Sequence, residues 1–138
     1  MTTTTALLTK RSEVLEGAIS LLETHGIYRG DFAGPTKDDG TCSFCMLGAM
    51  NRVVSDALPG IFNQEQEDEW DRLYDLKQDA HALVYSVLSK HSEYQAKAAE
   101  KGRALSIPNF NDLIASDEEI FAILRESVEA AKAAEAVQ

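Results

Sequence analysis

Apolar residues return at helical spacing along most of the chain. Three such stretches cover residues 9–26, 45–57 and 64–90, and a fourth begins near residue 116. Pro59-Gly60 closes the second stretch, because proline and glycine both end helices. The pattern predicts an all-α fold, a compact bundle of four or five helices with a small loop or β-hairpin insert after the first helix.

Capping residues indicate where these helices begin and end. Thr9 or Ser12 suits the N-cap of the first helix and Gly26 its C-cap, and Ser43 suits the N-cap of the second. Before the last helix, Ser116-Asp117-Glu118-Glu119 has the capping-box pattern, in which the serine and glutamate side chains satisfy each other's backbone donors.

Three segments interrupt or leave open the helical pattern. Residues 27–43 contain several glycines and Pro35, which favour a loop or a short hairpin turning at residues 35–40. His91-Ser92 leaves open whether residues 64–102 form one helix or two. Pro108 predicts an extended Ile107, so residues 106–115 are expected to form an ordered connector.

Length and composition predict a globular protein. The 138 residues are 44% hydrophobic and 26% charged, which fits one domain over 1–138 whose ends, 1–8 and 131–138, fray. The net charge of −10 disfavours direct binding to nucleic acid. The sequence also lacks the pattern of a signal peptide or membrane span, so a cytoplasmic location is expected.

The two cysteines form a C-x-x-C pattern, Cys42-Ser43-Phe44-Cys45, at the start of the second helix. A helix N-terminus stabilises a thiolate, so a dithiol redox site or a thiol nucleophile is one interpretation. Cys45 also lies on the apolar stripe of that helix, which favours burial as a small hydrophobic residue. No second pair of ligands accompanies the cysteines at zinc-site spacing, and no metal site is predicted.

Acidic residues gather at the start of the third helix. Residues 65–79 include seven acidic and two basic side chains, which gives this segment a net charge of −5. One interpretation is a solvated face near the helix N-terminus, where the helix dipole favours carboxylates. The other is a recognition surface for a basic partner, or a mimic of DNA phosphates, formed by Glu67, Asp68, Asp71 and Asp75 with Trp70 as an aromatic anchor.

Three short motifs flank the predicted helices. They are Ile27-Tyr28-Arg29-Gly30 after the first helix, Cys45-Met46-Leu47-Gly48-Ala49 opening the second, and Ile107-Pro108-Asn109-Phe110-Asn111-Asp112 before the last. In this order they resemble a family of unknown function found in actinobacteria and their phages. Phe110 stands where that family usually has tryptophan, and the acidic segment over 62–76 is longer than is typical of it. The resemblance implies an origin but no mechanism. It also suggests a pocket formed by Tyr28, Arg29, Cys45, Asn111 and Asp112.

These observations favour a small acidic protein without enzymatic activity, phage-encoded or actinobacterial, that binds a host or other cellular protein and needs no cofactor. Two alternatives remain open at this stage. One is a thiol-dependent enzyme or redox protein that uses Cys42 and Cys45. The other is an acidic DNA-mimic inhibitor that uses residues 65–79.

Overall fold

A computed structural model describes residues 8–31, 33–38, 42–58 and 66–137. The elements within these residues are all helical, which confirms the predicted all-α class. They number more than the expected four or five, because the chain between residues 64 and 115 divides more finely than its hydrophobic pattern indicates. In chain order they are α1 (Arg11–His25), α2 (Met46–Ala57), α3 (Glu67–Ser89), α4 (Ser92–Glu100), α5 (Ile107–Asn109), the π-helix η1 (Phe110–Ile114) and α6 (Asp117–Ala136).

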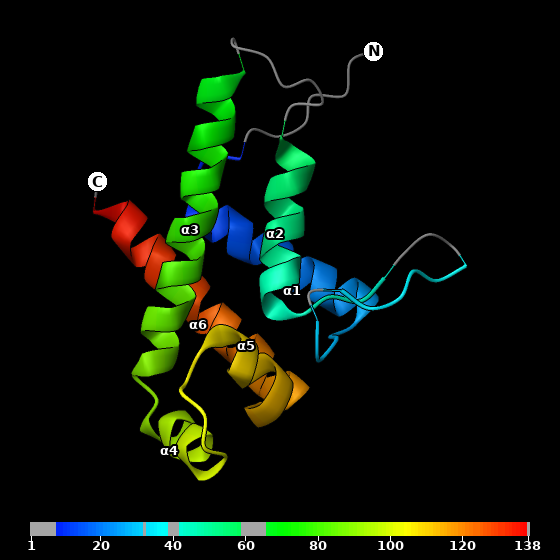
Figure 1. The fold of residues 1–138 in the computed structure, drawn as a ribbon. Coiled ribbons are helices and arrows are strands. Elements are labelled where there is room, and N and C mark those ends of the chain that lie inside the picture. The colour runs from blue at the N-terminus through cyan, green and yellow to red at the C-terminus, as the bar shows by residue number, and fades with distance from the viewer. Residues whose placement is uncertain (1–7, 32, 39–41, 59–65, 138) are drawn as a thin grey trace.

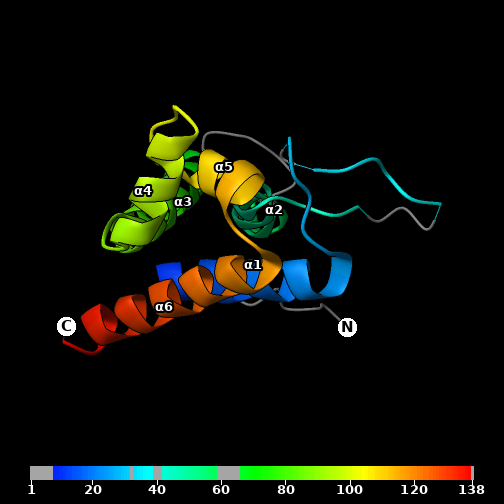
Figure 2. The same ribbon diagram turned by 90° about the horizontal axis from the view of Figure 1, so that it is seen from below.

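Helices α1 and α6 form an antiparallel pair on one side of the molecule (Figure 2). Polar contacts join the start of α1 to the end of α6: the Ser12 hydroxyl donates to Glu135 Oε1 at 2.7 Å, and Lys132 pairs with Glu16 at 2.8 Å. Helices α2 and α3 lie side by side and cross over this pair (Figure 1). The two layers bury one continuous hydrophobic core.

The core is formed by the apolar faces of the four longest helices. Gly17 of α1 marks a close approach to α2, because a Cβ atom there would lie 2.8 Å from Val53 Cγ2. Burial of these side chains is the main stabilising contribution to the fold. Fully buried examples from all four helices are Val14, Leu15 and Leu22, Met46 and Met50, Leu73, Val84 and Leu88, and Ile120, Ile123 and Leu124.

Helix α1 ends where predicted and begins with a different cap. Gly26 is the C-cap with a φ of 89°, a backbone conformation that favours glycine. The N-cap is Lys10 rather than Thr9 or Ser12. The Glu13 carboxylate accepts from the backbone N–H groups of Thr9 and Lys10 at 3.0 and 2.9 Å, so this side chain organises the first turn.

The described part of residues 64–102 forms two helices, which answers the question left open by the sequence. Helix α3 stops at Ser89 and α4 starts at Ser92. Gly102 then takes a φ of 67°, and the Arg103 N–H donates to Ala98 O at 2.9 Å. This Schellman geometry ends α4.

The connector over 106–115 is helical, and the prediction of an extended Ile107 is wrong. Ser106 takes the extended conformation instead and caps α5, its hydroxyl accepting from Asn109 N at 3.1 Å. Pro108 therefore lies in the first turn of α5, where proline needs no intrahelical donor. The next turn is a π-helix, closed by a bond of 2.9 Å from Ala115 N to Phe110 O.

The insert after α1 does not form the suggested hairpin in its described part. Its two ends meet in isolated bridges, Ile27 with Phe44 and Ala33 with Phe44, supported by a bond of 2.8 Å from Tyr28 N to Phe44 O. Residues 39 and 40 of the expected turn lie outside the described residues.

The last helix begins with the predicted capping box. The Ser116 hydroxyl accepts from Glu119 N at 3.2 Å, and Glu119 accepts from Ser116 N at 3.0 Å. Helix α6 extends to Ala136; Ala131 is buried, and Glu135 accepts a hydrogen bond from Ser12. None of the helices described has the length and apolar character needed to span a membrane.

Candidate functional site

The three family-like motifs meet at the side chain of Asn111, which is 1% exposed. Its carbonyl oxygen accepts from Met46 N, the first residue of α2, at 3.0 Å. Its amide nitrogen donates to Tyr28 O at 2.9 Å and to the Asp112 carboxylate at 2.8 Å. One buried amide thus joins the loop after α1, the start of α2 and the π-helix.

Arg29 extends this junction to the start of α6. Its guanidinium donates to Ala115 O at 3.0 Å and pairs with Asp117 at 2.8 Å. The Tyr28 ring lies against the loop, since a Cβ atom at Gly34 would be 2.9 Å from it. These side chains hold the loop on the helices.

A pocket of about 190 Å³ opens beside the junction, lined by Gly30, Asp31, Cys45, Leu47, Pro108 and Asp112. Of the five residues suggested from the sequence, Cys45 and Asp112 line this pocket. Tyr28, Arg29 and Asn111 belong to the same junction but do not line the pocket. The pocket therefore combines a thiol and a carboxylate with mostly apolar surroundings.

Cys45 is the N-cap of α2, a role that the sequence assigned to Ser43. Its sulfur accepts from Gly48 N at 3.2 Å, and the residue is 6% exposed. Burial raises the pKa of the Cys45 thiol, and the negative charge of Asp112 acts in the same direction. The thiol is therefore kept in its protonated, weakly nucleophilic form. Both cysteines are free thiols, and Cys42 is the more accessible.

We expect iodoacetamide to label Cys45 at least about tenfold more slowly than Cys42 in the native protein at neutral pH, because the buried thiol carries less thiolate. Mass spectrometry of Cys42→Ser and Cys45→Ser, each retaining one cysteine, measures the two rates separately. Equal rates in denaturant serve as the control. Fast labelling of native Cys45 would instead support the thiol-dependent alternative.

The acidic residues singled out in the sequence lie exposed on α3. Glu67, Asp68, Asp71 and Asp75 all face solvent, whereas Glu69 is paired with Arg72 and Glu65 lies outside the described residues. That ion pair lowers the pKa of Glu69. The outward carboxylates have no such pairing among the residues described, so they form one negatively charged surface.

The exposed aromatic residues of this surface are tyrosines, whereas the sequence suggested Trp70 as the anchor. Trp70 is half-buried and lines a pocket of about 200 Å³ with Val54, Leu58, Tyr74 and Lys77. Tyr74 and Tyr85 are the exposed aromatic residues of α3, at 54% and 49%. Eleven residues correspond to about three helical turns, so both tyrosines lie on one side of α3. Tyr74 lies among the acidic residues, and Tyr85 lies about 15 Å beyond Asp75 along the helix. We call Glu67, Asp68, Asp71, Asp75, Tyr74 and Tyr85 the α3 surface.

A further pocket, of about 350 Å³, was not foreseen from the sequence. It lies where the start of α1, the middle of α3 and the end of α6 meet, and no short motif marks it because its residues come from three distant segments. Asp79 belonged to the acidic set and Glu135 to the tail expected to fray. The lining residues are Thr9, Lys10, Arg11, Leu76, Asp79, Ala134 and Glu135.

No group of three or more His, Cys, Asp or Glu side chains is placed to hold a metal ion within the described ranges.

The structure defines a small all-α protein in which the three motifs meet at one buried polar junction. Residues 7–130 match a family of unknown function, DUF6197, and the chain belongs to this family. The matched range contains all three motifs on which the resemblance was based. No curated protein and no solved structure matches the chain.

Proposed function

We propose that the protein acts without catalysis by binding a cellular protein with a basic surface, and that the α3 surface is where it binds. The observation that supports this most directly is the exposure of Tyr74 among four outward carboxylates, with Tyr85 exposed further along the same side of α3. Tyrosine is enriched among the residues that dominate protein interfaces. Opposite charge steers association and selects the partner.

Local contacts prepare one of these tyrosines for binding. The Gln78 amide donates to the Tyr74 hydroxyl at 3.1 Å, and Lys77 Nζ lies 4.8 Å from the centre of the Tyr74 ring. These contacts restrict the ring before any partner arrives, which reduces the entropy lost on binding. The thiol alternative receives less support, because the Cys45 thiol is buried and its pKa is raised.

The test combines capture from host lysate with kinetics on the captured partner. The variant Glu67→Gln/Asp71→Asn/Asp75→Asn is expected to associate about tenfold more slowly at low salt, since steering is electrostatic, and to lose most of its salt dependence. Tyr85→Ala is expected to weaken affinity about tenfold through faster dissociation.

The matched control is Glu100→Gln/Glu118→Gln/Glu129→Gln, which removes three exposed carboxylates outside α3 and gives the same net charge. It should bind like the parent protein. Equal losses in the two triple variants would reduce the effect to overall charge and contradict the α3 surface. Competition by duplex DNA for the partner would identify a DNA-binding protein, as the DNA-mimic hypothesis requires.

A further inference from the structure

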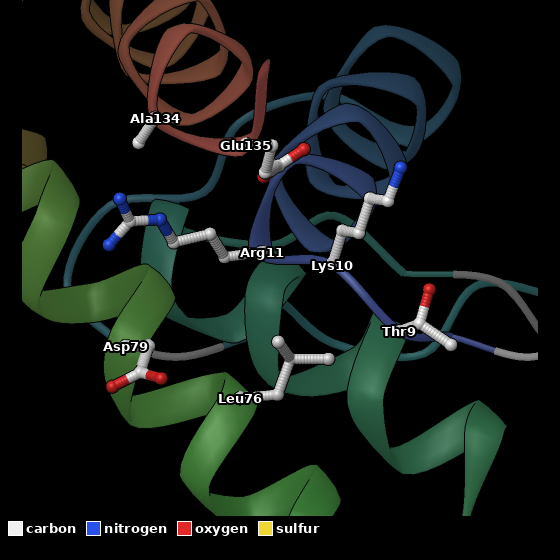
Figure 3. A pocket seen from close by; sticks show the side chains of 7 residues that line it. All are labelled: Thr9, Lys10, Arg11, Leu76, Asp79, Ala134 and Glu135. Carbon is white, nitrogen blue, oxygen red and sulfur yellow. The ribbon is translucent and has the colours of Figure 1, made fainter. Parts of the chain in front are cut away.

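The pocket of about 350 Å³ between α1, α3 and α6 has the size of a small-molecule site (Figure 3). Its walls carry charges of both signs. Lys10 and Arg11 come from the start of α1, Asp79 from α3 and Glu135 from α6. Leu76 and Ala134 supply apolar surface between them.

Two of these charged side chains have no partner in the described part of the protein. The guanidinium of Arg11 and the carboxylate of Asp79 form neither an ion pair nor a side-chain hydrogen bond with any described residue. In Figure 3 the Arg11 side chain extends toward the side of the pocket on which the Asp79 carboxylate lies. An unpaired cation and an unpaired anion thus border one cavity.

Glu135 adds a third unsatisfied group. Its Oε1 accepts from the buried Ser12 hydroxyl at 2.7 Å, whereas Oε2 is buried and has no hydrogen-bond partner. A buried carboxylate oxygen without a donor is costly, and a water molecule or a bound group that donates to it removes this cost. The terminal torsion of glutamate is soft, so a small rotation lets Oε2 meet a donor placed in the pocket.

We propose that this pocket binds a free α-amino acid with an apolar side chain. The ligand carboxylate pairs with the Arg11 guanidinium, whose planar donors suit two carboxylate oxygens. The ligand ammonium donates to the Asp79 carboxylate, which lies on the same side of the pocket as the guanidinium. The apolar side chain contacts Leu76 and Ala134. The site is separate from the α3 surface, and no residue is shared between the two.

Calorimetric titration with L-leucine tests the site, with two analogues that each lack one charge. 4-Methylpentanoate keeps the carboxylate and 3-methylbutylamine keeps the ammonium. We expect L-leucine to bind at least about tenfold more tightly than either analogue, since each loses one charge-assisted contact. Absence of binding at about 10 mM L-leucine, or equal binding of all three compounds, would overturn the proposal.

Two variants assign the charges within the pocket. Arg11→Gln is expected to weaken L-leucine at least about tenfold and to leave 3-methylbutylamine unchanged, because that analogue has no carboxylate. Asp79→Asn is expected to weaken L-leucine and to leave 4-methylpentanoate unchanged. Arg52→Gln and Asp38→Asn make the same chemical changes at exposed positions outside the pocket and should bind like the parent protein. Full L-leucine affinity in Arg11→Gln and Asp79→Asn would contradict the assignment.

Discussion

Replacing Asn111 with alanine is expected to lower the free energy of unfolding by about 3 kcal/mol. The substitution leaves the buried Met46 N–H and the part-buried Tyr28 carbonyl without their partner. Each unsatisfied buried group costs about 1–3 kcal/mol, whereas an exposed one is repaired by water. The first turn of α2 and the loop after α1 should both loosen. Urea denaturation followed by circular dichroism measures the change.

Asn109→Ala is the matched control for this prediction. The Asn109 amide donates to Ala104 O at 2.8 Å in an exposed position, so its loss should cost less than about 1 kcal/mol. A second variant, Asn111→Asp, keeps an acceptor for Met46 N and removes the donor to Tyr28 O. It also places a second carboxylate beside Asp112. If Asn111→Ala unfolds at the same urea concentration as Asn109→Ala, Asn111 does not hold the junction together.

The features that the sequence predicted correctly depend on residues close together in the chain. The Ser116 and Glu119 capping box needs only three residues of spacing and one turn of helix, and it is present. Gly26 ends α1 because glycine accepts the positive φ required there. The apolar stripes likewise located the long helices and placed Cys45 in the core.

The features that were missed depend on tertiary contacts. The π-turn from Phe110 to Ala115 positions Asn111 between the loop and α2, and local propensity contains no signal for that position. The N-cap of α2 is Cys45 and not the predicted Ser43, because Phe44 still pairs with the loop before the helix starts. The motif spacing indicated that Cys45, Asn111 and Asp112 belong together, but not which of them are structural.

The surface of α3 likewise has some features set by the local sequence and others set by tertiary contacts. Exposure of Glu67, Asp71 and Asp75 follows from the helical period once α3 is placed. Which aromatic residue remains exposed does not follow from it, since Trp70 and Tyr74 lie one turn apart and α2 packs beside this part of α3. The neighbouring helix therefore decides that Trp70 is half-buried and Tyr74 is not.

Phe110→Ala is expected to have the largest effect of any single substitution, a loss of about 4 kcal/mol in the free energy of unfolding. The Phe110 side chain is fully buried, and its ring meets the Tyr94 ring edge-on at a centroid distance of 4.7 Å. The ring joins the π-turn to α4, so its removal leaves a cavity and detaches Tyr94 from its neighbour. Burial and the nearby Glu119 raise the pKa of Tyr94 to about 12 in the intact protein.

Two companion variants define what the Phe110 site tolerates. Leu113→Ala removes a similar apolar side chain from the same π-turn, but Leu113 is 43% exposed, so its loss should cost about 1 kcal/mol or less. Phe110→Trp introduces the residue more usual in the resembling family, and the larger ring should cost about 1–3 kcal/mol because the surrounding core is already filled. Urea denaturation of the three variants measures the changes in the free energy of unfolding. Absorbance titration follows the pKa of Tyr94. A Phe110→Ala variant as stable as Leu113→Ala would mean that α4 and the π-turn are held together by contacts other than this ring pair.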